Sequence, residues 1–381
     1  MLREHIFKLF THSDALVSVL IVFLGFLVGT ILILLVGRNP SGMYSSIIQV
    51  VTGFSKNRAG AWVWNSRYIG EWLVSSMPLI LCGFSMAFAA RTGLFNIGAE
   101  GQYIIGLTAA QFVALFGPPV PLLHWILAVA AAIAAGALWG GIVGFLKAQF
   151  TVSEVVATIM MNYIALYVSR YVTVLIPGTN TFQTVPFPKT ARLSSAFLET
   201  ITNTSRLNYG LYLTIGAIFF FWIVMGKTTL GFSLRATGLN KEAARYSGIN
   251  VNISLTAAMA IAGGFAGLAG AIVSLGSFSA GRVLAGQDGY GFDGIAVALV
   301  GNSTAWGTAL SGLLFGMLKS AQPLMQSRQI PKEITAIIMG LVVVFISLRA
   351  GVQIFIDWQA KKLKQKELES STGMEKGSTT G

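Results

Sequence analysis

The 381-residue sequence has few of the residues from which soluble enzymes build their sites. Charged residues make up only 10% of the chain, against about 25% in an average soluble domain. A single cysteine, Cys82, excludes an internal disulfide, and three histidines leave almost nothing for a metal site. Cys82 lies in an apolar run and is interpreted as a small buried hydrophobic residue. No metal and no resident cofactor are therefore expected in this chain.

Motifs for nucleotide binding and for catalysis are also missing. The phosphate-binding pattern G-x-x-x-x-G-K-[ST] does not occur, so the chain is not predicted to bind ATP. Gly289, Gly291 and Gly294 imitate the G-x-G-x-x-G spacing of dinucleotide sites, but no strand precedes them and an apolar segment follows. We interpret them as hinge and turn glycines. Because no Ser-His-Asp set or paired carboxylates are apparent, the chain is not expected to be an enzyme.

What the sequence does contain is apolar residues. Hydrophobic types account for 54% of the chain, and the mean hydropathy is +0.70. The net charge of +12 could suggest a nucleic-acid partner. The basic residues are scattered between apolar stretches, however, so membrane lipid is the expected surroundings and no nucleic acid is expected.

Ten apolar segments are candidates for transmembrane helices, since a helix needs about 20 apolar residues to cross a bilayer. The two weakest, 293–303 and 305–322, could instead be one long span or a re-entrant pair. The sequence therefore predicts an all-α integral membrane protein with about ten transmembrane helices. The ten segments are 15–37, 72–90, 94–116, 122–146, 154–176, 209–226, 251–278, 293–303, 305–322 and 332–350.

The basic flanks of the spans predict their orientation. The first span is too long for a signal-peptide core and has no cleavage site, so residues 1–14 are expected to stay in the cytoplasm. The membrane domain is then 15–350. With ten spans, the lysine-rich tail 351–381 is also cytoplasmic, as the positive-inside rule prefers, and it is expected to be disordered.

Glycines recur at intervals of four in several spans, which puts them on one helix face and allows two backbones to approach closely. Packing within the bundle explains them, and a dimer seam at one of them is the alternative. They are Gly25 and Gly29; Gly136, Gly140 and Gly144; Gly263 and Gly267; and Gly312 and Gly316.

One compact charged segment, 231–250, interrupts the apolar chain. Six spans precede it, so it is predicted to lie in the cytoplasm. Asn240 is expected to cap a short helix that ends at Gly248. Glu242 and Arg245 are placed to suit the helix dipole. A solvated loop is the alternative, but a plain connector needs fewer residues.

This segment resembles the cytoplasmic loop of ABC-importer permeases. Glu242, Ala243, Ala244 and Gly248 match the E-A-A-x-x-x-G core of that loop, although its later Leu-Pro is absent. From about Ser75 to Arg349 the chain resembles the branched-chain amino-acid and ribose type of permease, most of all the permeases of bacterial nucleoside importers. The matching stretches are RTGLFNIGAEGQ (91–102), TIMMNYIA (158–165), RATGLNKEAARYSG (235–248), GFAGLAGA (264–271) and GYGFDGIAVALVGN (289–302).

The resemblance implies a ribose- or cobalamin-type importer fold in the bacterial cell membrane. It implies a second, related permease subunit, a cytoplasmic ABC ATPase that binds ATP and Mg²⁺, and an extracellular substrate-binding lipoprotein. The ATPase is expected to dock on the 231–250 loop. The expected coupling residues are Arg235, Gly238, Leu239, Asn240, Glu242, Ala243, Ala244, Arg245 and Gly248.

Polar residues within spans are costly in a bilayer and are therefore candidates for function. A nucleoside offers hydrogen-bonding edges, hydroxyls and an aromatic face, so its pathway is expected to supply amides and aromatic rings. The predicted pathway residues are Asn96, Gln102, Asn162, Tyr163, Phe292, Asp293 and Asn302. A structural role is an equal alternative for Asn162 and Asp293. Arg91, Glu100 and Glu154 are interpreted as residues that pin span ends.

Three arginines, Arg67, Arg192 and Arg282, fall outside the cell in this topology, where the positive-inside rule does not favour them. A carboxylate-bearing binding protein would explain them, and solvated loop charge is the alternative.

The leading hypothesis is thus the transmembrane subunit of an ATP-driven nucleoside importer. The alternatives are the permease of a ribose or simple-sugar importer, a stand-alone facilitator without an ATPase, and a membrane-embedded enzyme. The sequence leaves open which nucleoside is moved and whether the partner permease is a second copy or a different chain.

Overall fold

The computed structural model describes residues 14–56 and 60–347. The predicted tail 351–381 and the N-terminal segment 1–13 lie outside these residues. The chain divides into two compact units: residues 1–32 with 337–381, and residues 33–336. Each unit is described below by itself.

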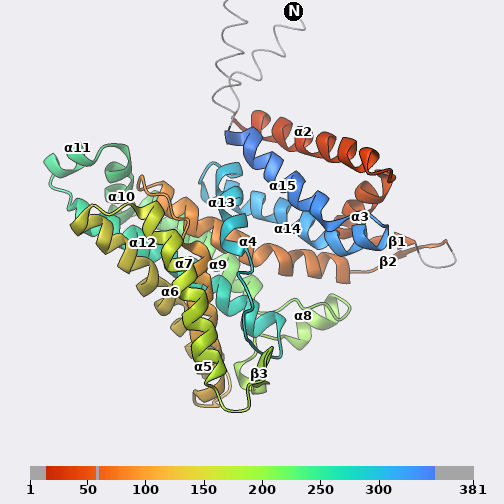
Figure 1. Cartoon of the computed structure of the whole chain (residues 1–381), viewed down its shortest axis with the longest axis horizontal. Coiled ribbons are helices and arrows are strands. Elements are labelled where there is room, and N and C mark those ends of the chain that lie inside the picture. Colours follow the sequence, from red (N-terminus) through yellow and green to blue (C-terminus); the bar gives the residue numbers. More distant parts are fainter. Residues whose placement is uncertain (1–13, 57–59, 348–381) are drawn as a thin grey trace, which may run out of the picture. The chain divides into compact units, whose positions relative to one another are not determined.

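The described residues are mainly helical and contain almost no sheet (Figure 1), which confirms the predicted all-α class. Two small antiparallel sheets of two strands each are the exception. The elements are α2 (Asp14–Leu35), α3 (Ser41–Thr52), β1 (Phe54–Lys56), β2 (Trp62–Trp64), α4 (Arg67–Ala90), α5 (Ala99–Phe116), α6 (Leu123–Phe150), α7 (Glu154–Val174), β3 (Gln183–Pro186), the 3₁₀ turn η1 (Lys189–Ala191), α8 (Ala196–Ile201), α9 (Gly210–Lys227), α10 (Thr229–Leu239), α11 (Lys241–Tyr246), α12 (Val251–Ala271), the π-helical turn η2 (Ile272–Gly276), β4 (Ala280–Arg282), α13 (Tyr290–Val300), α14 (Ala305–Ser327) and α15 (Lys332–Ser347).

Every predicted span coincides with a helix. Among the described residues, five helices are long and apolar enough to cross a membrane by themselves: α4, α6, α7, α9, and α12 continued to Gly276. The number of spans therefore stays a prediction. One difference in bounds is α5, which begins at Ala99 rather than near 94, because a turn with a left-handed Gly93 comes first.

The two long connecting segments, 38–71 and 177–208, hold structure that the hydropathy pattern did not predict. The first contains α3 and the β1–β2 hairpin, and the second contains β3, η1 and α8. β3 pairs with β4, which follows η2 more than 90 residues later. This pairing ties the second connecting segment to the far end of α12.

Helices α6 and α12 make the most extensive helix–helix contact described in the larger unit. A Cβ atom on Gly136 would lie 2.8 Å from Gly267 Cα, and one on Gly144 would lie 2.8 Å from Thr256 Cα. Real Cβ atoms do not approach so closely, so only glycine fits. The four-residue glycine pattern of α6 thus serves packing inside the chain, as predicted.

Close packing within the chain also explains glycines in two other helices. Gly316 of α14 lies against Ser76 of α4, with only 2.7 Å between an added Cβ and Ser76 Cα. In the smaller unit, Gly25 of α2 faces Val342 of α15. Each pair marks a helix crossing at which a side chain would not fit.

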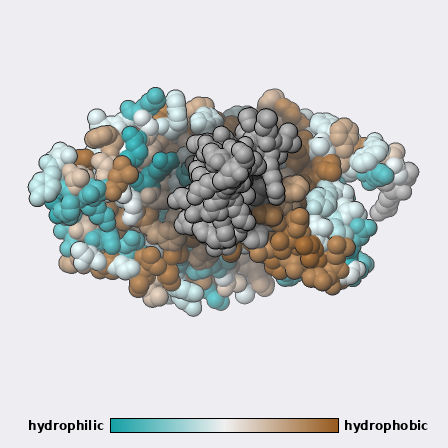
Figure 2. Space-filling model, turned by 90° about the horizontal axis from the view of Figure 1, so that it is seen from above, coloured by the Kyte–Doolittle hydropathy of each residue, from teal (hydrophilic) through white to brown (hydrophobic). Residues whose placement is uncertain are grey.

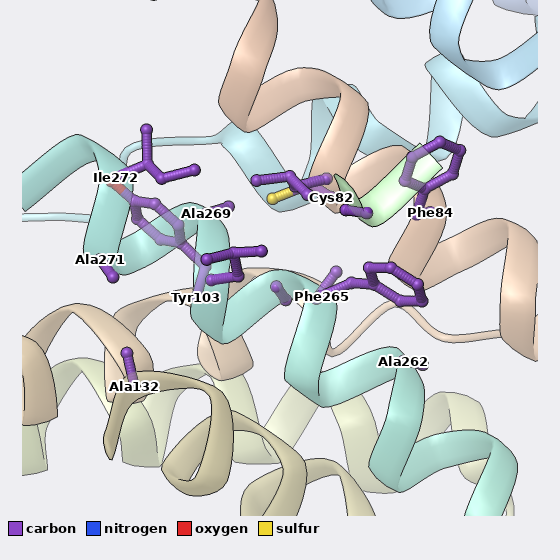
Figure 3. Packing of buried hydrophobic residues seen from close by; sticks show 14 of the residues in the cluster. Cys82, Phe84, Tyr103, Ala132, Ala262, Phe265, Ala269, Ala271 and Ile272 are labelled. Carbon is purple, nitrogen blue, oxygen red and sulfur yellow. The ribbon is translucent and has the colours of Figure 1, made fainter. Parts of the chain in front are cut away.

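Aromatic residues fill the core of the larger unit. Phe84 and Phe265 lie 5.6 Å apart between ring centroids, and Phe221 stacks on Phe84 at 5.0 Å. Figure 3 shows Phe84 and Phe265 facing each other, with Cys82 nearby. Cys82 is fully buried, which confirms the prediction that it packs as a small apolar residue.

Helices α13 and α14 form a hairpin, so 293–322 is not one continuous span, while two spans and a re-entrant pair both stay open. The turn between them places Asn302 and Ser303 in the left-handed region, with φ of 51° and 48°. α13 has 11 residues, so its length of about 16 Å is roughly half of the apolar thickness of a bilayer. α13 is therefore a short helix packed on α4 and α14 rather than a continuous part of one span.

Candidate functional site

The larger unit has two distinct ends. α12 begins next to α11 and leads through η2 into β4, so α11 and the β3–β4 sheet lie at opposite ends of a long helix. Figure 1 shows α11 at the left and β3 at the bottom. We refer to these as the α11 end and the sheet end. The predicted coupling residues lie at the α11 end. The three predicted docking arginines lie at or near the sheet end.

The predicted helix start at Asn240 is confirmed. Asn240 Oδ1 accepts hydrogen bonds from the backbone N–H of Glu242 and Ala243, both at 3.0 Å. Gly248 ends the segment with φ of 82°, in the left-handed region where glycine costs least. The result is a short, well-capped helix at the surface.

The side chains around this helix are strongly exposed. Leu239, before it, is 89% exposed and Tyr246, at its last position, is 92% exposed. Glu242 and Arg245 pair with each other on the surface at 3.4 Å. Figure 2 shows hydrophilic residues gathered at the left end of the molecule, where Figure 1 places α10 and α11. Two large apolar side chains that are this exposed on a hydrophilic surface could be buried by contact with a protein partner.

The coupling segment is joined to the membrane helices through α10. Gly238 lies so close to the backbone of Thr92 that an added Cβ would be 2.9 Å from the Thr92 carbonyl carbon. The neighbouring Arg91 donates from Nε to the carbonyl of Ser303, at 2.8 Å, in the turn between α13 and α14. The end of α4 therefore links α10 to the α13–α14 hairpin.

Two of the predicted pathway amides are bonded to each other. Asn96 Nδ2 donates to Gln102 Oε1 at 3.0 Å, and Gln102 Nε2 donates to Asn96 Oδ1 at 3.2 Å. Asn96 Nδ2 also donates to Ser85 Oγ at 2.9 Å. All three side chains are buried. Their polar groups are satisfied within the chain, so a pathway role for Asn96 and Gln102 stays a prediction.

Asn162 clamps α7 to the start of α5. Its Oδ1 accepts from the Gly101 N–H at 2.7 Å, and its Nδ2 donates to the Ile97 carbonyl at 3.0 Å. The side chain is 1% exposed. Tyr163, the next residue, is 54% exposed on the other side of α7.

We therefore expect Asn162→Leu to act mainly on stability. The change leaves a buried N–H and a buried C=O without partners, at about 1–3 kcal/mol each. The melting temperature and the yield of complex should fall, while transport per assembled complex is preserved. A stable variant that assembles normally but takes up substrate poorly would instead assign Asn162 to the pathway.

Glu100 holds the start of α13. Its two carboxylate oxygens accept the backbone N–H groups of Gly289, at 2.8 Å, and Gly291, at 2.6 Å. Gly291 packs on the Glu100 backbone and Gly294 on Cys82, at distances that leave no room for a Cβ. This explains the glycine spacing that imitates a dinucleotide motif. Glu100 fits the structural role predicted for it.

Arg91 and Glu154 also fit that structural interpretation. Arg91 binds backbone carbonyls of the α13–α14 turn, as described above. Glu154, at the start of α7, forms an ion pair with Lys147 at 2.7 Å.

Side chains of α5, β4, α13 and α14 and of the segment before α13 form a group that we call the aromatic–ionic cluster. Lys319 Nζ binds Asp293 Oδ2 at 2.8 Å and lies 4.1 Å from the centre of the Tyr290 ring. Phe292, between Tyr290 and Asp293 in sequence, is 41% exposed. The cluster consists of Tyr103, Arg282, Asp288, Tyr290, Asp293 and Lys319, and we count Phe292 with it because it lies between Tyr290 and Asp293 in the sequence.

The other half of the cluster reaches toward the sheet end. Arg282 forms two hydrogen bonds with Asp288, at 2.7 and 2.8 Å, and Tyr103 donates its hydroxyl to the same carboxylate at 2.9 Å. Burial alone lowers the pKa of the Arg282 guanidinium, but the bonds and charge of Asp288 raise it above its ordinary value. The Arg282 guanidinium therefore stays charged beside Asp288. The Tyr103 and Tyr290 rings, 5.5 Å apart, join the two halves.

Sequence reasoning identified only part of this cluster. Phe292 and Asp293 were predicted for the pathway and Arg282 for docking, whereas Tyr103, Asp288, Tyr290 and Lys319 were not selected. Lys319 was the available signal, because a lysine within an apolar segment needs a partner. Asn302, also predicted, contributes its carbonyl to Arg91 in the turn, at 3.5 Å.

The three predicted docking arginines have different surroundings. Arg67 is exposed at the start of α4, where Ser66 bonds to the end of α8. Arg192 is half-buried and donates to the carbonyl of Ser279 at 3.3 Å. Arg282 is already paired with Asp288. Within 14–56 and 60–347, no group of three or more His, Cys, Asp or Glu is placed to hold a metal ion.

Comparison with known proteins gives a consistent family. A family model described as "Branched-chain amino acid transport system / permease component" matches residues 68–347. The guanosine ABC transporter permease protein NupP of Bacillus subtilis is 38% identical over 92% of this chain and 97% of its own length. The nucleoside ABC transporter permease protein NupB of Lactococcus lactis subsp. cremoris is 34% identical over 94% and 97%.

More distant relatives widen the comparison. The glucose ABC transporter permease protein TsgB13 of Haloferax volcanii is 34% identical over 72% of this chain and 75% of its own length. The two bacteria above each have a second matching permease: NupQ, 30% identical over 65% of this chain and 79% of its own length, and NupC, 28% identical over 66% and 80%. No solved structure matches.

Proposed function

Because the chain belongs to the branched-chain amino acid transport system permease family, we propose that it is the transmembrane subunit of an ATP-driven importer of nucleosides. The substrate class rests on the two relatives named as guanosine and nucleoside permeases, which match more than nine-tenths of this chain. The observation that favours ATP coupling is the capped helix α11 with its exposed Leu239 and Tyr246.

The orientation follows from this coupling. An ATPase works in the cytoplasm, so the α11 end would face the cytoplasm and the sheet end would face outward. The chain termini, predicted to be cytoplasmic, lie in residues outside the described part. Arg235, Gly238, Ala243 and Ala244 would support the docking surface from α10 and α11, while Leu239, Glu242, Arg245 and Tyr246 would touch the ATPase.

The aromatic–ionic cluster suits a nucleoside. Phe292 and Tyr290 offer ring faces on which a base can stack, an interaction that tolerates different bases. Asp293 and Lys319 offer an acceptor and a donor to ribose hydroxyls or to base edges. Their charges cancel within the pair, which fits an uncharged substrate. We propose that this cluster lies along the substrate pathway.

Two further partners belong to the proposal. NupP with NupQ, and NupB with NupC, are two permeases from one organism each, which supports a second, related permease as the partner of this chain. An extracellular binding lipoprotein would dock at the sheet end. Arg67, the most exposed of the three arginines, and Arg192 are available there, whereas Arg282 would first have to leave Asp288.

The test is uptake by proteoliposomes that contain the chain with its permease, ATPase and binding-protein partners. Radiolabelled guanosine should accumulate only when ATP is present on the side of the membrane where the ATPase is bound. An excess of adenosine or of other nucleosides should compete with its uptake. Uptake without ATP would identify a facilitator. Uptake of glucose or ribose but not of guanosine would identify a sugar importer, the alternative that the similarity to TsgB13 favours.

A further inference from the structure

A small crevice opens at the α11 end, apart from the aromatic–ionic cluster. It lies between α9, α10 and the turn that precedes α14, and its volume is about 160 Å³, several times the space that one water needs. It is lined by Arg91, Phe221, Trp222, Met225, Gly226, Arg235, Thr304 and Ala305.

The charge in this crevice is positive, and no acidic side chain among residues 14–56 and 60–347 pairs with it. Arg91 uses Nε and Nη2 to hold the carbonyls of Ser303 and Asn302, which leaves its Nη1 available. Arg235 has no hydrogen bond or ion pair with any described residue. None of the lining residues is acidic. Lys227, at the end of α9, adds a third cation 5.7 Å from the centre of the Trp222 ring.

The rest of the crevice is mainly apolar and lies beside the C-terminal end of α9. Trp222 is partly exposed on the last turns of α9, and tryptophan is typical of the boundary between lipid tails and headgroups. Met225 and Phe221 line the deeper wall. Cations at the mouth with an aromatic and aliphatic wall behind them match a lipid headgroup and the upper part of its chain.

We propose that this crevice binds the phosphate of an anionic phospholipid, such as phosphatidylglycerol, through Arg91 and Arg235. Basic pockets between membrane helices bind lipid headgroups in this way. The phosphate would bridge two elements: α10, which leads to α11 and packs through Gly238 on the backbone of Arg91 and Thr92, and the α13–α14 turn, which Arg91 holds. The bound lipid would thereby brace the coupling segment against the hairpin that carries part of the aromatic–ionic cluster.

Lipid retention by the purified full-length chain tests the proposal without reference to its substrate. Native mass spectrometry would follow binding of dioctanoyl phosphatidylglycerol and, separately, dioctanoyl phosphatidylcholine. Phosphatidylglycerol should bind more tightly. Arg235→Gln should weaken its binding about fivefold, the contribution of one basic residue near an anionic lipid surface, and Arg235→Lys should retain most of the affinity.

The matched control is Arg170→Gln, which removes an exposed arginine of α7 that has no partner among the described residues. It should bind phosphatidylglycerol like the unchanged protein. Equal affinity for the two lipids, or no effect of Arg235→Gln, would overturn the proposal. Displacement of the lipid by inorganic phosphate at similar concentration would replace it with a free-anion site. Loss of lipid when the ATPase binds would mean that Arg235 belongs to the protein contact.

Discussion

Replacing Leu239 and Tyr246 together by alanine is expected to reduce ATP-driven uptake by about two orders of magnitude. The two side chains are 89% and 92% exposed, so their removal costs the isolated subunit almost no packing. In a complex, burying each large apolar side chain contributes about 1.5–3 kcal/mol. Losing both would weaken ATPase docking at least a hundredfold, which copurification of the ATPase with the tagged permease would measure.

A matched control separates docking from folding. Tyr171→Ala removes a tyrosine that is 69% exposed on α7, far along the chain from the coupling segment, and should leave copurification unchanged. Gly248→Val gives a second, independent perturbation. Gly248 has φ of 82°, and a Cβ atom added to it would have no other atom within 4 Å, so the valine disturbs only the backbone at the end of α11. Normal copurification and uptake in both the double variant and Gly248→Val would show that this surface does not couple.

The second large effect is expected at Phe292. Phe292→Ala should raise the KM for nucleoside uptake about tenfold or more, because stacking of one base on an aromatic ring is worth about 1–3 kcal/mol. Phe292 is 41% exposed and has no ring neighbour among the described residues, so little of the effect should come from lost packing. Initial uptake rates over a range of guanosine concentrations would give the KM.

Phe145→Ala is the corresponding control, since Phe145 of α6 is 49% exposed and lies outside the cluster. Its KM should be unchanged. Phe292→Leu helps to separate stacking from bulk, because leucine keeps much of the apolar volume but has no ring face; it should resemble the alanine variant. Uptake kinetics that are the same in all these variants would remove Phe292 from the pathway and leave Tyr290 as the aromatic candidate.

Features that repeat locally along the chain could be predicted from the sequence. Apolar runs located the helices of the ten predicted spans, and the Asn240 and Gly248 signals located α11 within a residue or two. The glycine spacing of α6 also indicated close packing correctly. In each case the information is carried by neighbours within one or two helical turns, where residue type and periodicity act directly.

What the sequence could not show depends on partners that are distant along the chain. Glu100 is satisfied by backbone groups 189 and 191 positions away, and backbone donors carry no sequence signal. Lys319 and Asp293 are on two different helices, so their pairing required knowledge of the α13–α14 turn. The short strands β3 and β4 were missed because three or four residues are too few for a strand pattern to emerge.

The glycine contacts between α6 and α12 have a consequence for movement. Backbones that interlock through missing side chains cannot slide past one another: a shift of one residue would drive Cβ atoms into the main chain of the opposite helix. Gly136 and Gly267 therefore act as a steric lock, and we expect the two helices to move as one rigid body. On this expectation, the rearrangements of a transport cycle occur in other helices, for which α6 and α12 provide the frame.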